Sequence, residues 1–316
     1  MNNRVFLFPG QGSQAVGMGL DLFEKSEFAQ KTFRRADEVL GYPLSRLCFS
    51  GPEEELKLTF NTQPALLTVS YILFTLLGKE PALAAGHSLG EYSALLCAGV
   101  FRFEDALLLV HKRGKYMQKA VPVGKGAMAA LIGAGIDDIR AVLDAVNREL
   151  ADLPVDPDGV RRVVNLANWN SASQVVISGE KGAVEEAVRR LGVKSVFLPV
   201  SAPFHSELML PAEEKLSLDL DRVEFAAPRF PVINNWQVQM VTGAAEAREG
   251  LKKQVSRLVR WHETMEALLA DPAVAYFAEI GSGRVLAGLL KRAAREKNRQ
   301  LQIVNIENLA DLEKNA

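Results

Sequence analysis

A five-residue pattern, Gly86-His87-Ser88-Leu89-Gly90, constrains the possible folds of this chain more than any other feature of its sequence. The pattern follows an apolar, strand-like run at Ala82–Ala85 and precedes a helix-like segment at Glu91–Cys97. Between a strand and a helix, G-x-S-x-G predicts a nucleophile elbow, a sharp turn that exposes the serine hydroxyl. The helix dipole and the free N–H of Leu89 are then placed to stabilise an oxyanion. We predict Ser88 as a nucleophile; the alternative is a turn that only caps the helix.

A serine nucleophile needs a general base, and histidine is the usual one. His205 lies in a loop after a predicted strand, a position where catalytic residues are often found. His87 adjoins Ser88 and should point away from it, His111 lies inside an amphipathic helix, and His262 has no clear assignment. By elimination, we predict His205 as the base.

No acidic residue between the serine and the histidine is an obvious partner for the imidazole ring. Asp152, Asp156 and Asp158 lie in a segment rich in Pro, Asp and Gly, which we expect to be a solvent-exposed loop. The order of serine before histidine nevertheless matches that of α/β-hydrolases. A carbonyl or amide oxygen is the expected alternative partner of the ring.

Strand-like and helix-like segments alternate along most of the chain, which favours a mostly parallel sheet with helices on both faces. The predicted strands of this part are Arg4–Phe8, Ala82–Ala85, Pro231–Asn234 and Ala275–Ile280, and the predicted helices include Gln63–Leu77, Glu91–Cys97 and Phe103–Lys119.

The middle of the chain has a different order, β-α-β-β-α-β, which is typical of a ferredoxin-like unit. Its predicted elements are Ala127–Ile132, Asp137–Leu150, Val163–Asn168, Gln174–Ser178, Lys181–Leu191 and Ser195–Val200, with a turn at Asn170-Ser171 between the central strands. We therefore predict an α/β fold in two parts. Residues 1–125 and 199–316 form an α/β-hydrolase-like catalytic domain, and residues 126–198 form an inserted ferredoxin-like subdomain.

Composition excludes several classes of function. The 37 basic and 38 acidic side chains are balanced, which argues against nucleic acid as a partner. Only two cysteines, Cys48 and Cys97, are present, too few for a disulfide framework, which fits the reducing cytoplasm. The four histidines show no metal-ligand spacing.

No membrane segment or secretion signal is expected. The most apolar stretch, Pro64–Leu77, is interrupted by polar residues and is shorter than the roughly 20 residues that span a bilayer, so we interpret it as a buried helix. Met1-Asn2-Asn3-Arg4 leads directly into the first predicted strand.

Gly10-Gln11-Gly12-Ser13-Gln14-Ala15 fits the dinucleotide-binding pattern G-x-G-x-x-G/A. That motif also needs a second strand ending in an acid about 20 residues later. Here the corresponding region, Phe28–Leu40, has a helical pattern, so no nicotinamide cofactor is expected. A better use for this turn is to bring a backbone N–H of Gln11 close to a reacting carbonyl.

Taken together, these residues resemble the malonyl-CoA:acyl carrier protein transacylase family. The blocks that carry the resemblance occur in the family's order and span nearly the whole chain. The stronger blocks are Phe8–Gln14, Gln63–Leu67, Gly86–Ala94 and Arg113–Gln118, and the weaker ones are Gln174–Gly179, Ser201–His205 and Glu279–Leu286.

The resemblance implies a two-step acyl transfer without a cofactor. Ser88 would take the malonyl group from malonyl-CoA with His205 as base, and the phosphopantetheine thiol of acyl carrier protein would then accept it. The N–H groups of Gln11 and Leu89 would form the oxyanion hole. A backbone carbonyl, assigned to Gln254, would orient the histidine in place of an acid.

The resemblance also implies the residues that recognise malonate. Arg113 would hold its carboxylate, which a planar guanidinium can grip with two parallel hydrogen bonds; its sequence context alone suggests only a solvated cation. Gln63 and Phe204 would complete the substrate site, with the Phe204 ring crowding the α-carbon against methylmalonyl groups.

Three alternatives stay open at this point. The chain could be an acyltransferase that serves a polyketide synthase rather than fatty-acid synthesis, a serine thioesterase or esterase, or a silent scaffold that binds carrier protein. Arg113 separates the transferase from an ordinary esterase, which does not need it. We expect a cytoplasmic monomer, with the candidate carrier-docking cations Lys181, Arg189, Arg190, Arg284, Lys291 and Arg292.

Overall fold

The larger part of the molecule is built on a six-stranded sheet with the strand order β10-β9-β1-β2-β7-β8. The structure is a computed structural model that describes residues 3–200 and 202–315, so Met1, Asn2, Ser201 and Ala316 lie outside the described residues. Every neighbouring pair in this sheet is parallel except β7 and β8. The sheet comprises β1 (Arg4–Phe8), β2 (Leu83–Gly86), β7 (Val232–Ile233), β8 (Met240–Val241), β9 (Tyr276–Ile280) and β10 (Gln302–Ile306). The predicted mostly parallel sheet is confirmed.

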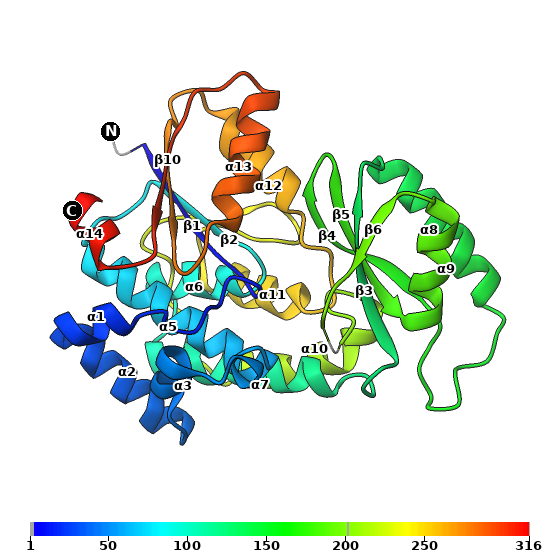
Figure 1. Ribbon diagram of the computed structural model, residues 1–316, viewed down its shortest axis with the longest axis horizontal. Coiled ribbons are helices and arrows are strands. Elements are labelled where there is room, and N and C mark those ends of the chain that lie inside the picture. Colours follow the sequence, from blue (N-terminus) through cyan, green and yellow to red (C-terminus); the bar gives the residue numbers. More distant parts are fainter. Residues whose placement is uncertain (1–2, 201, 316) are drawn as a thin grey trace.

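Helices cover both faces of this sheet (Figure 1). The helices of this larger part are α1 (Leu20–Lys25), α2 (Glu27–Leu40), α3 (Leu44–Ser50), α4 (Glu53–Leu56), α5 (Thr59–Leu77), α6 (Leu89–Cys97), α7 (Phe103–Lys119), η1 (Glu207–Met209), α10 (Leu210–Leu220), α11 (Ala244–Gln254), α12 (Trp261–Ala270), α13 (Val285–Glu296) and α14 (Leu309–Asn315).

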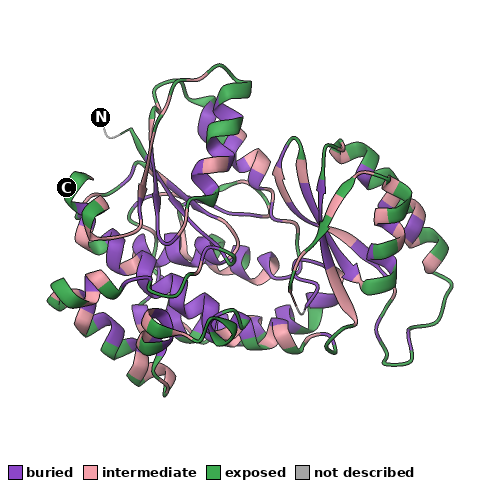
Figure 2. Ribbon diagram, viewed as in Figure 1, coloured by how far each residue is buried: buried purple, intermediate pink, exposed green. Residues whose placement is uncertain are grey.

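Strand β1 shows how the sequence sets these two layers. Successive side chains of a strand point to opposite faces. Phe6 and Phe8 accordingly join the core that contains α5 and α6, and Val5 and Leu7 join the core under α12 and α13. Because all four are fully buried, the strand is apolar throughout, as expected for a parallel sheet covered on both sides. Figure 2 shows the buried residues concentrated between these layers.

Helix α5 is the apolar segment that the sequence marked as a buried helix. It is long and apolar enough to cross a membrane, but 78% of its most apolar window is buried inside the protein. It contacts α7 more extensively than any other helix. Its apolar character is thus explained by packing in the core.

A second, four-stranded antiparallel sheet lies beside the large one, with helices on one of its faces (Figure 1). Its strand order is β4-β5-β3-β6. The elements follow the chain as β3 (Gly126–Ile132), α8 (Ile136–Leu150), β4 (Val164–Ser171), β5 (Gln174–Glu180), α9 (Lys181–Leu191) and β6 (Lys194–Phe197). The buried faces of α8 and α9 form a separate apolar core with this sheet.

The predicted turn at Asn170-Ser171 is wrong. Both residues belong to β4, and Ser171 pairs with Gln174, so the chain turns at residues 172–173. Two irregularities in the β4–β5 register lengthen the strand past the point where its apolar pattern stops. As a result, Asn170 Oδ1 lies 3.0 Å from His87 Nε2, beside the elbow.

Candidate active site

Ser88 lies at the sharp turn between β2 and α6. Its backbone has φ 52° and ψ −105°, a strained conformation for a residue with a side chain, as expected at a nucleophile elbow. Gly90, in the first turn of α6, packs so closely on β1 that a Cβ would overlap the Phe8 carbonyl oxygen. The turn is held from the other side by Asn235, whose Oδ1 accepts a hydrogen bond from Ser88 N at 2.6 Å.

His205 reaches the serine from the loop that follows β6. Its Nε2 lies 2.8 Å from Ser88 Oγ, and its Nδ1 lies 2.9 Å from the carbonyl oxygen of Gln254. A carbonyl oxygen only accepts, so Nδ1 carries the proton and the neutral ring presents Nε2 as the acceptor of the serine hydroxyl. The geometry is that of a nucleophile, a base and an orienting group in a row.

The environment of His205 keeps its ring neutral. The side chain is only 4% exposed. Burial, followed by the positive charge of Arg113, lowers the pKa of His205 to about 3. Near neutral pH the ring is therefore in the form that can accept a proton.

Arg113 extends from α7 into the same place. The side chain is only 2% exposed, whereas its sequence context suggested a cation in contact with solvent. Its Nη1 donates to Gln63 Oε1 at 2.8 Å, and its Nη2 donates to Ser88 Oγ and to Gln254 Oε1, both at 3.0 Å.

The guanidinium of Arg113 is a buried cation that lacks an acidic partner. Among the residues that the structure describes, no carboxylate forms an ion pair with it, and its Nε–H has no hydrogen-bond acceptor. Burial lowers the pKa of Arg113 from its usual value. The charge of Glu91, which reaches Arg113 only through the Gln254 amide, opposes this shift. Because a buried charge without a counter-ion in contact is costly, the site is suited to an anion brought in from outside.

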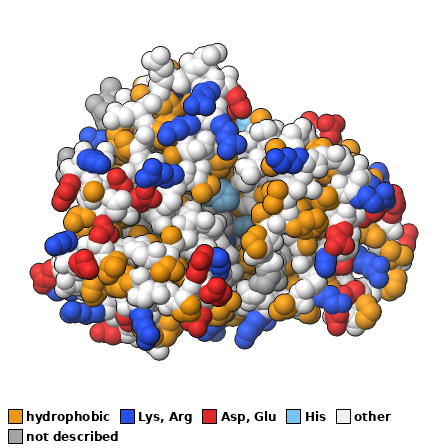
Figure 3. Space-filling view, viewed as in Figure 1, with side chains coloured by type: hydrophobic (Ala, Val, Ile, Leu, Met, Phe, Trp, Pro, Cys, Tyr) orange, Lys and Arg blue, Asp and Glu red, His pale blue; other side chains and the backbone are white. Residues whose placement is uncertain are grey.

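The predicted residues line one pocket of about 120 Å³. Its walls include seven of the eight predicted site residues, namely Gln11, Gln63, Ser88, Leu89, Arg113, Phe204 and His205. Gln254 lies behind them, fully buried. Met128 and Asn168 of the antiparallel sheet complete the wall, so the pocket lies where the two parts of the molecule meet. Figure 3 shows this junction as a hollow with histidine atoms on its floor.

Comparisons with known proteins agree with this geometry. A model of the acyl transferase domain matches residues 5–314. The chain belongs to this family. It is an acyltransferase, and the resemblance noted in the sequence is confirmed.

Relatives of this acyltransferase include two bacterial proteins named malonyl CoA-acyl carrier protein transacylase. The one from Salmonella typhimurium is 46% identical over 300 residues, covering 92% of this chain and 93% of that protein. The one from Bacillus subtilis is 43% identical over 320 residues, covering 99% of this chain and 96% of that protein.

Solved structures give the same result. The malonyl CoA-acyl carrier protein transacylase from Coxiella burnetii superposes with a TM-score of 0.89 at 39% identity, covering 98% of this chain and 96% of that one. A malonyl-transacylase solved in complex with a type II PKS acyl-carrier protein has a TM-score of 0.89 at 42% identity, covering 99% of this chain and 98% of that one.

The other histidines of the acyltransferase do not reach the serine hydroxyl. His87 turns its Nε2 toward Asn170, and its ring packs against Trp261. His111 Nδ1 lies 2.8 Å from the Phe60 carbonyl oxygen, and His262 stacks at a tilt on Trp169. The geometry therefore agrees with the prediction that His205, and not one of these three histidines, is the base.

The loop acids also lie away from the base. Asp152 and Asp158 are exposed as expected, but Asp156 is only 8% exposed. Its carboxylate accepts hydrogen bonds from the backbone of its own loop and pairs with Lys125 at 3.0 Å, which removes it from solvent.

Gln11 lies at the pocket because its turn packs directly on the elbow. A Cβ at Gly10 would overlap the carbonyl oxygen of His87, so only glycine allows this approach. The region that would need a second strand in a dinucleotide site is helix α2. Within residues 3–200 and 202–315, no group of three or more His, Cys, Asp or Glu side chains is arranged to hold a metal ion.

Sequence reasoning missed two residues beneath the elbow, Glu91 and Asn235. Glu91 Oε2 accepts hydrogen bonds from Gln254 Nε2 at 2.7 Å and from Asn235 N at 3.0 Å. The sequence did carry a signal for Glu91, since it is the one charged residue of the helix that follows the elbow. Asn235 carried none, because its contact with Ser88 joins residues 147 positions apart.

Proposed function

We propose that this acyltransferase moves the malonyl group of malonyl-CoA to the phosphopantetheine thiol of acyl carrier protein through a malonyl ester of Ser88. The observation that carries the proposal is the buried guanidinium of Arg113, which forms no ion pair with a carboxylate of the described residues and lies 3.0 Å from Ser88 Oγ. An esterase for neutral acyl groups has no use for a cation there. The names of the relatives support the same substrate and acceptor.

In the first step, Ser88 Oγ attacks the thioester carbonyl while His205 Nε2 takes the hydroxyl proton. The carbonyl oxygen becomes an oxyanion facing the N–H groups of Gln11 and Leu89, at the pocket wall and at the N-terminus of α6. The intermediate collapses with cleavage of the carbon–sulfur bond, and the CoA thiolate receives the proton from His205. The products are malonyl-Ser88 and free CoA.

In the second step, the thiol of the carrier's pantetheine arm repeats the attack on the ester. His205 takes the thiol proton and returns it to Ser88 Oγ as the ester bond breaks. Gln254 supports both steps, because its carbonyl holds the ring with Nε2 toward the serine. The enzyme returns to its starting state.

Arg113 is proposed to hold the free carboxylate of the malonyl group. Gln63 and Gln254 accept hydrogen bonds from its two terminal nitrogens and so fix the plane of the guanidinium. Phe204 forms the wall of the same pocket, where its ring would crowd a methyl group on the α-carbon. Size and charge would thus select malonyl together.

We further propose that residues 126–198 form a ferredoxin-like subdomain inserted into an α/β-hydrolase-like domain of residues 1–125 and 199–316. The β-α-β-β-α-β order and the antiparallel order β4-β5-β3-β6 support the first assignment. The serine elbow after a parallel strand supports the second.

The proposed setting is a cytoplasmic monomer that supplies fatty-acid synthesis. A polyketide pathway is the second candidate, because one structural neighbour was solved with a type II PKS acyl-carrier protein. Neither candidate needs nucleic acid, a membrane or a cofactor.

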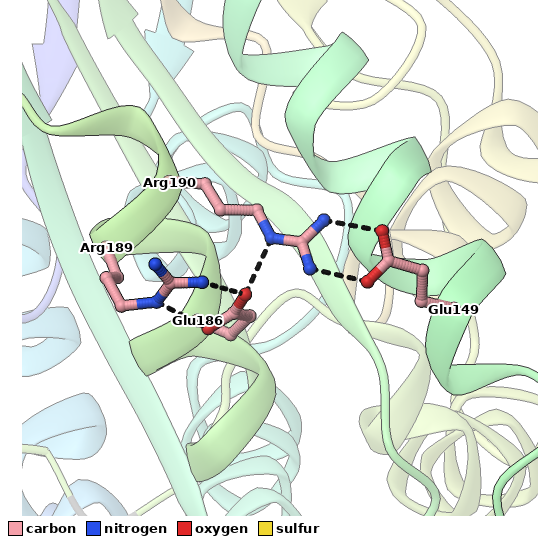
Figure 4. Close-up of polar contacts among 4 residues, drawn as sticks. All are labelled: Glu149, Glu186, Arg189 and Arg190. Atoms are coloured by element: carbon pink, nitrogen blue, oxygen red, sulfur yellow. Dashed lines mark hydrogen bonds and ion pairs between the residues drawn. The ribbon is translucent and has the colours of Figure 1, made fainter.

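Several of the cations considered for carrier docking already have acidic partners. Arg190 pairs with Glu149 of α8 and thereby joins α9 to α8 (Figure 4). Within α9, Arg189 and Arg190 both pair with Glu186. Lys181 pairs with Glu185 and Arg284 with Glu307. Lys291 and Arg292, exposed on α13, have no such ion pair among the described residues and are the better candidates for an acidic carrier.

Replacing Arg113 with alanine tests the carboxylate clamp. We expect Arg113→Ala to lower acylation of Ser88 by malonyl-CoA about 100-fold, because two charge-assisted hydrogen bonds to the carboxylate are lost. Acylation by acetyl-CoA should change much less. The measurement is the single-turnover rate with each donor.

Lys115→Ala is the matched control, since it removes an exposed cation from the same helix and should leave both rates unchanged. An equal loss of the malonyl and acetyl rates in Arg113→Ala would show that Arg113 does not bind the malonyl carboxylate.

A further inference from the structure

Glu91 is a buried carboxylate that the proposed steps do not use. It lies in the first turn of α6, three residues after Ser88, and is 1% exposed. Its Oε2 accepts one hydrogen bond from the side chain of Gln254 and one from the backbone of Asn235. Burying a carboxylate is costly unless it is hydrogen-bonded, and these two donors are the groups that Glu91 holds in return.

The first partner, Gln254, connects Glu91 to the base and to the clamp. Its backbone oxygen accepts from His205 Nδ1, and its side-chain Oε1 accepts from Arg113 Nη2. Its Nε2 donates to Glu91 Oε2 at 2.7 Å and to the Ser88 carbonyl oxygen at 2.9 Å. Two acceptors facing Nε2 fix which way the amide points, because the flipped amide would turn N–H groups toward the guanidinium.

The second partner, Asn235, connects Glu91 to the nucleophile. Its backbone N–H donates to Glu91, while its side chain accepts from Ser88 N at 2.6 Å and donates to the Gly86 carbonyl oxygen at 2.7 Å. These bonds span the strained elbow from one side to the other. The position of Asn235 therefore bears on the position of Ser88.

We propose that Glu91 is a positioning residue for the acyl transfer. Through Gln254 it sets the carbonyl that orients His205 and the amide oxygen that orients Arg113, and through Asn235 it supports the turn that presents Ser88. The inference rests on the proposed function, because it concerns the same reaction. Glu91 does not itself touch the reacting atoms.

The position of Oε2, rather than the negative charge, is what this role requires. Burial raises the pKa of Glu91 to about 7, so both protonation states are populated near neutral pH. A proton on Oε1 leaves Oε2 free to accept both hydrogen bonds. Glutamine at this position can place its amide oxygen where Oε2 lies.

The test compares Glu91→Ala with Glu91→Gln in single-turnover acylation by malonyl-CoA and acetyl-CoA. We expect Glu91→Ala to lower the acetyl rate about tenfold through the loosened base, and to lower the malonyl rate further, so that the malonyl-to-acetyl ratio falls. Glu91→Gln should restore both rates to within about threefold of the original protein.

Glu279→Ala is the matched control for the loss of a buried carboxylate. Glu279 on β9 is fully buried, burial raises its pKa to about 7, and it accepts hydrogen bonds from Leu286 N and Ala287 N at the start of α13. Its loss should lower the melting temperature without changing the malonyl-to-acetyl ratio. The same pattern in Glu91→Ala would overturn the positioning role.

If Glu91→Ala does not fold, Glu91→Asp gives the answer, because it keeps the acid but withdraws the oxygen by one methylene. Wild-type rates and ratio in Glu91→Asp would contradict the inference. If the original protein forms no malonyl adduct at all, the proposed malonyl transfer is wrong. That outcome is distinct from failure of the positioning role of Glu91, in which the original protein still forms the adduct.

Discussion

Ser88 Oγ is engaged by two groups at once in the free protein. Its hydroxyl donates a hydrogen bond to His205 Nε2 at 2.8 Å, and Ser88 Oγ accepts one from Arg113 Nη2 at 3.0 Å. An incoming carboxylate is a stronger acceptor for the guanidinium than a hydroxyl oxygen is. Binding of the malonyl group is thus expected to draw Arg113 from the nucleophile and leave the serine to its base.

The low pKa of His205 predicts how the rate of Ser88 acylation depends on pH. The burst rate with p-nitrophenyl acetate, a neutral donor, should stay nearly constant from pH 8 to pH 5, because the ring stays neutral until about pH 3. An ordinary histidine would lose its base function through its usual pKa of 6.5. An inflection near pH 6.5 that persists in Glu91→Gln would contradict the neutral buried base.

The same shift has a cost in stability. Between the usual pKa of 6.5 and the folded value of about 3, the unfolded chain binds a proton at this histidine and the folded protein does not. Its contribution to the free energy of unfolding is therefore complete above pH 6.5 and is lost as the pH falls toward 3.

At the scale of elements, the site depends on how closely α6 approaches β1. Both Gly90 and Gly288 lie in helices, but their surroundings differ. A Cβ at position 90 would overlap the Phe8 carbonyl oxygen, whereas nothing lies within 4 Å of a Cβ at position 288 in α13. The same substitution should therefore have opposite effects.

We expect Gly288→Ala to raise the free energy of unfolding by up to about 1 kcal/mol, through helix propensity. Gly90→Ala should lower it by about 3 kcal/mol, because the strand and the helix must move apart. Urea unfolding of the two variants measures both values. Equal changes in the two variants would contradict the close packing of the elbow.

Long apolar or strictly patterned elements could be predicted from the sequence, and short ones could not. The bounds of β1 and α7 match the predictions because an apolar run and an amphipathic period define them. Strand β7 lies inside the predicted strand Pro231–Asn234, but the two-residue strand β8, which pairs with it antiparallel, carries too little pattern to be predicted. The Asn170-Ser171 turn failed because irregular pairing in β4 overrode a strong local turn preference.

At the scale of the whole molecule, the pocket forms where the antiparallel sheet meets the elbow. Ser88, His205 and Arg113 were within reach of sequence motifs and of the family resemblance. The burial of Arg113 was not, because it depends on α5 and α11 closing over it from distant parts of the chain. Asn235 was out of reach for the same reason.

Intact mass spectrometry can follow the malonyl group that Ser88 is proposed to carry from CoA to a carrier thiol. Malonyl-CoA should leave one malonyl adduct that is absent in Ser88→Ala. Adding carrier protein with its pantetheine arm should move the adduct to the carrier far faster than buffer alone removes it. No adduct, or an adduct that survives Ser88→Ala, would mean that Ser88 is not the nucleophile, and equally fast loss to water would mean that the protein is a hydrolase.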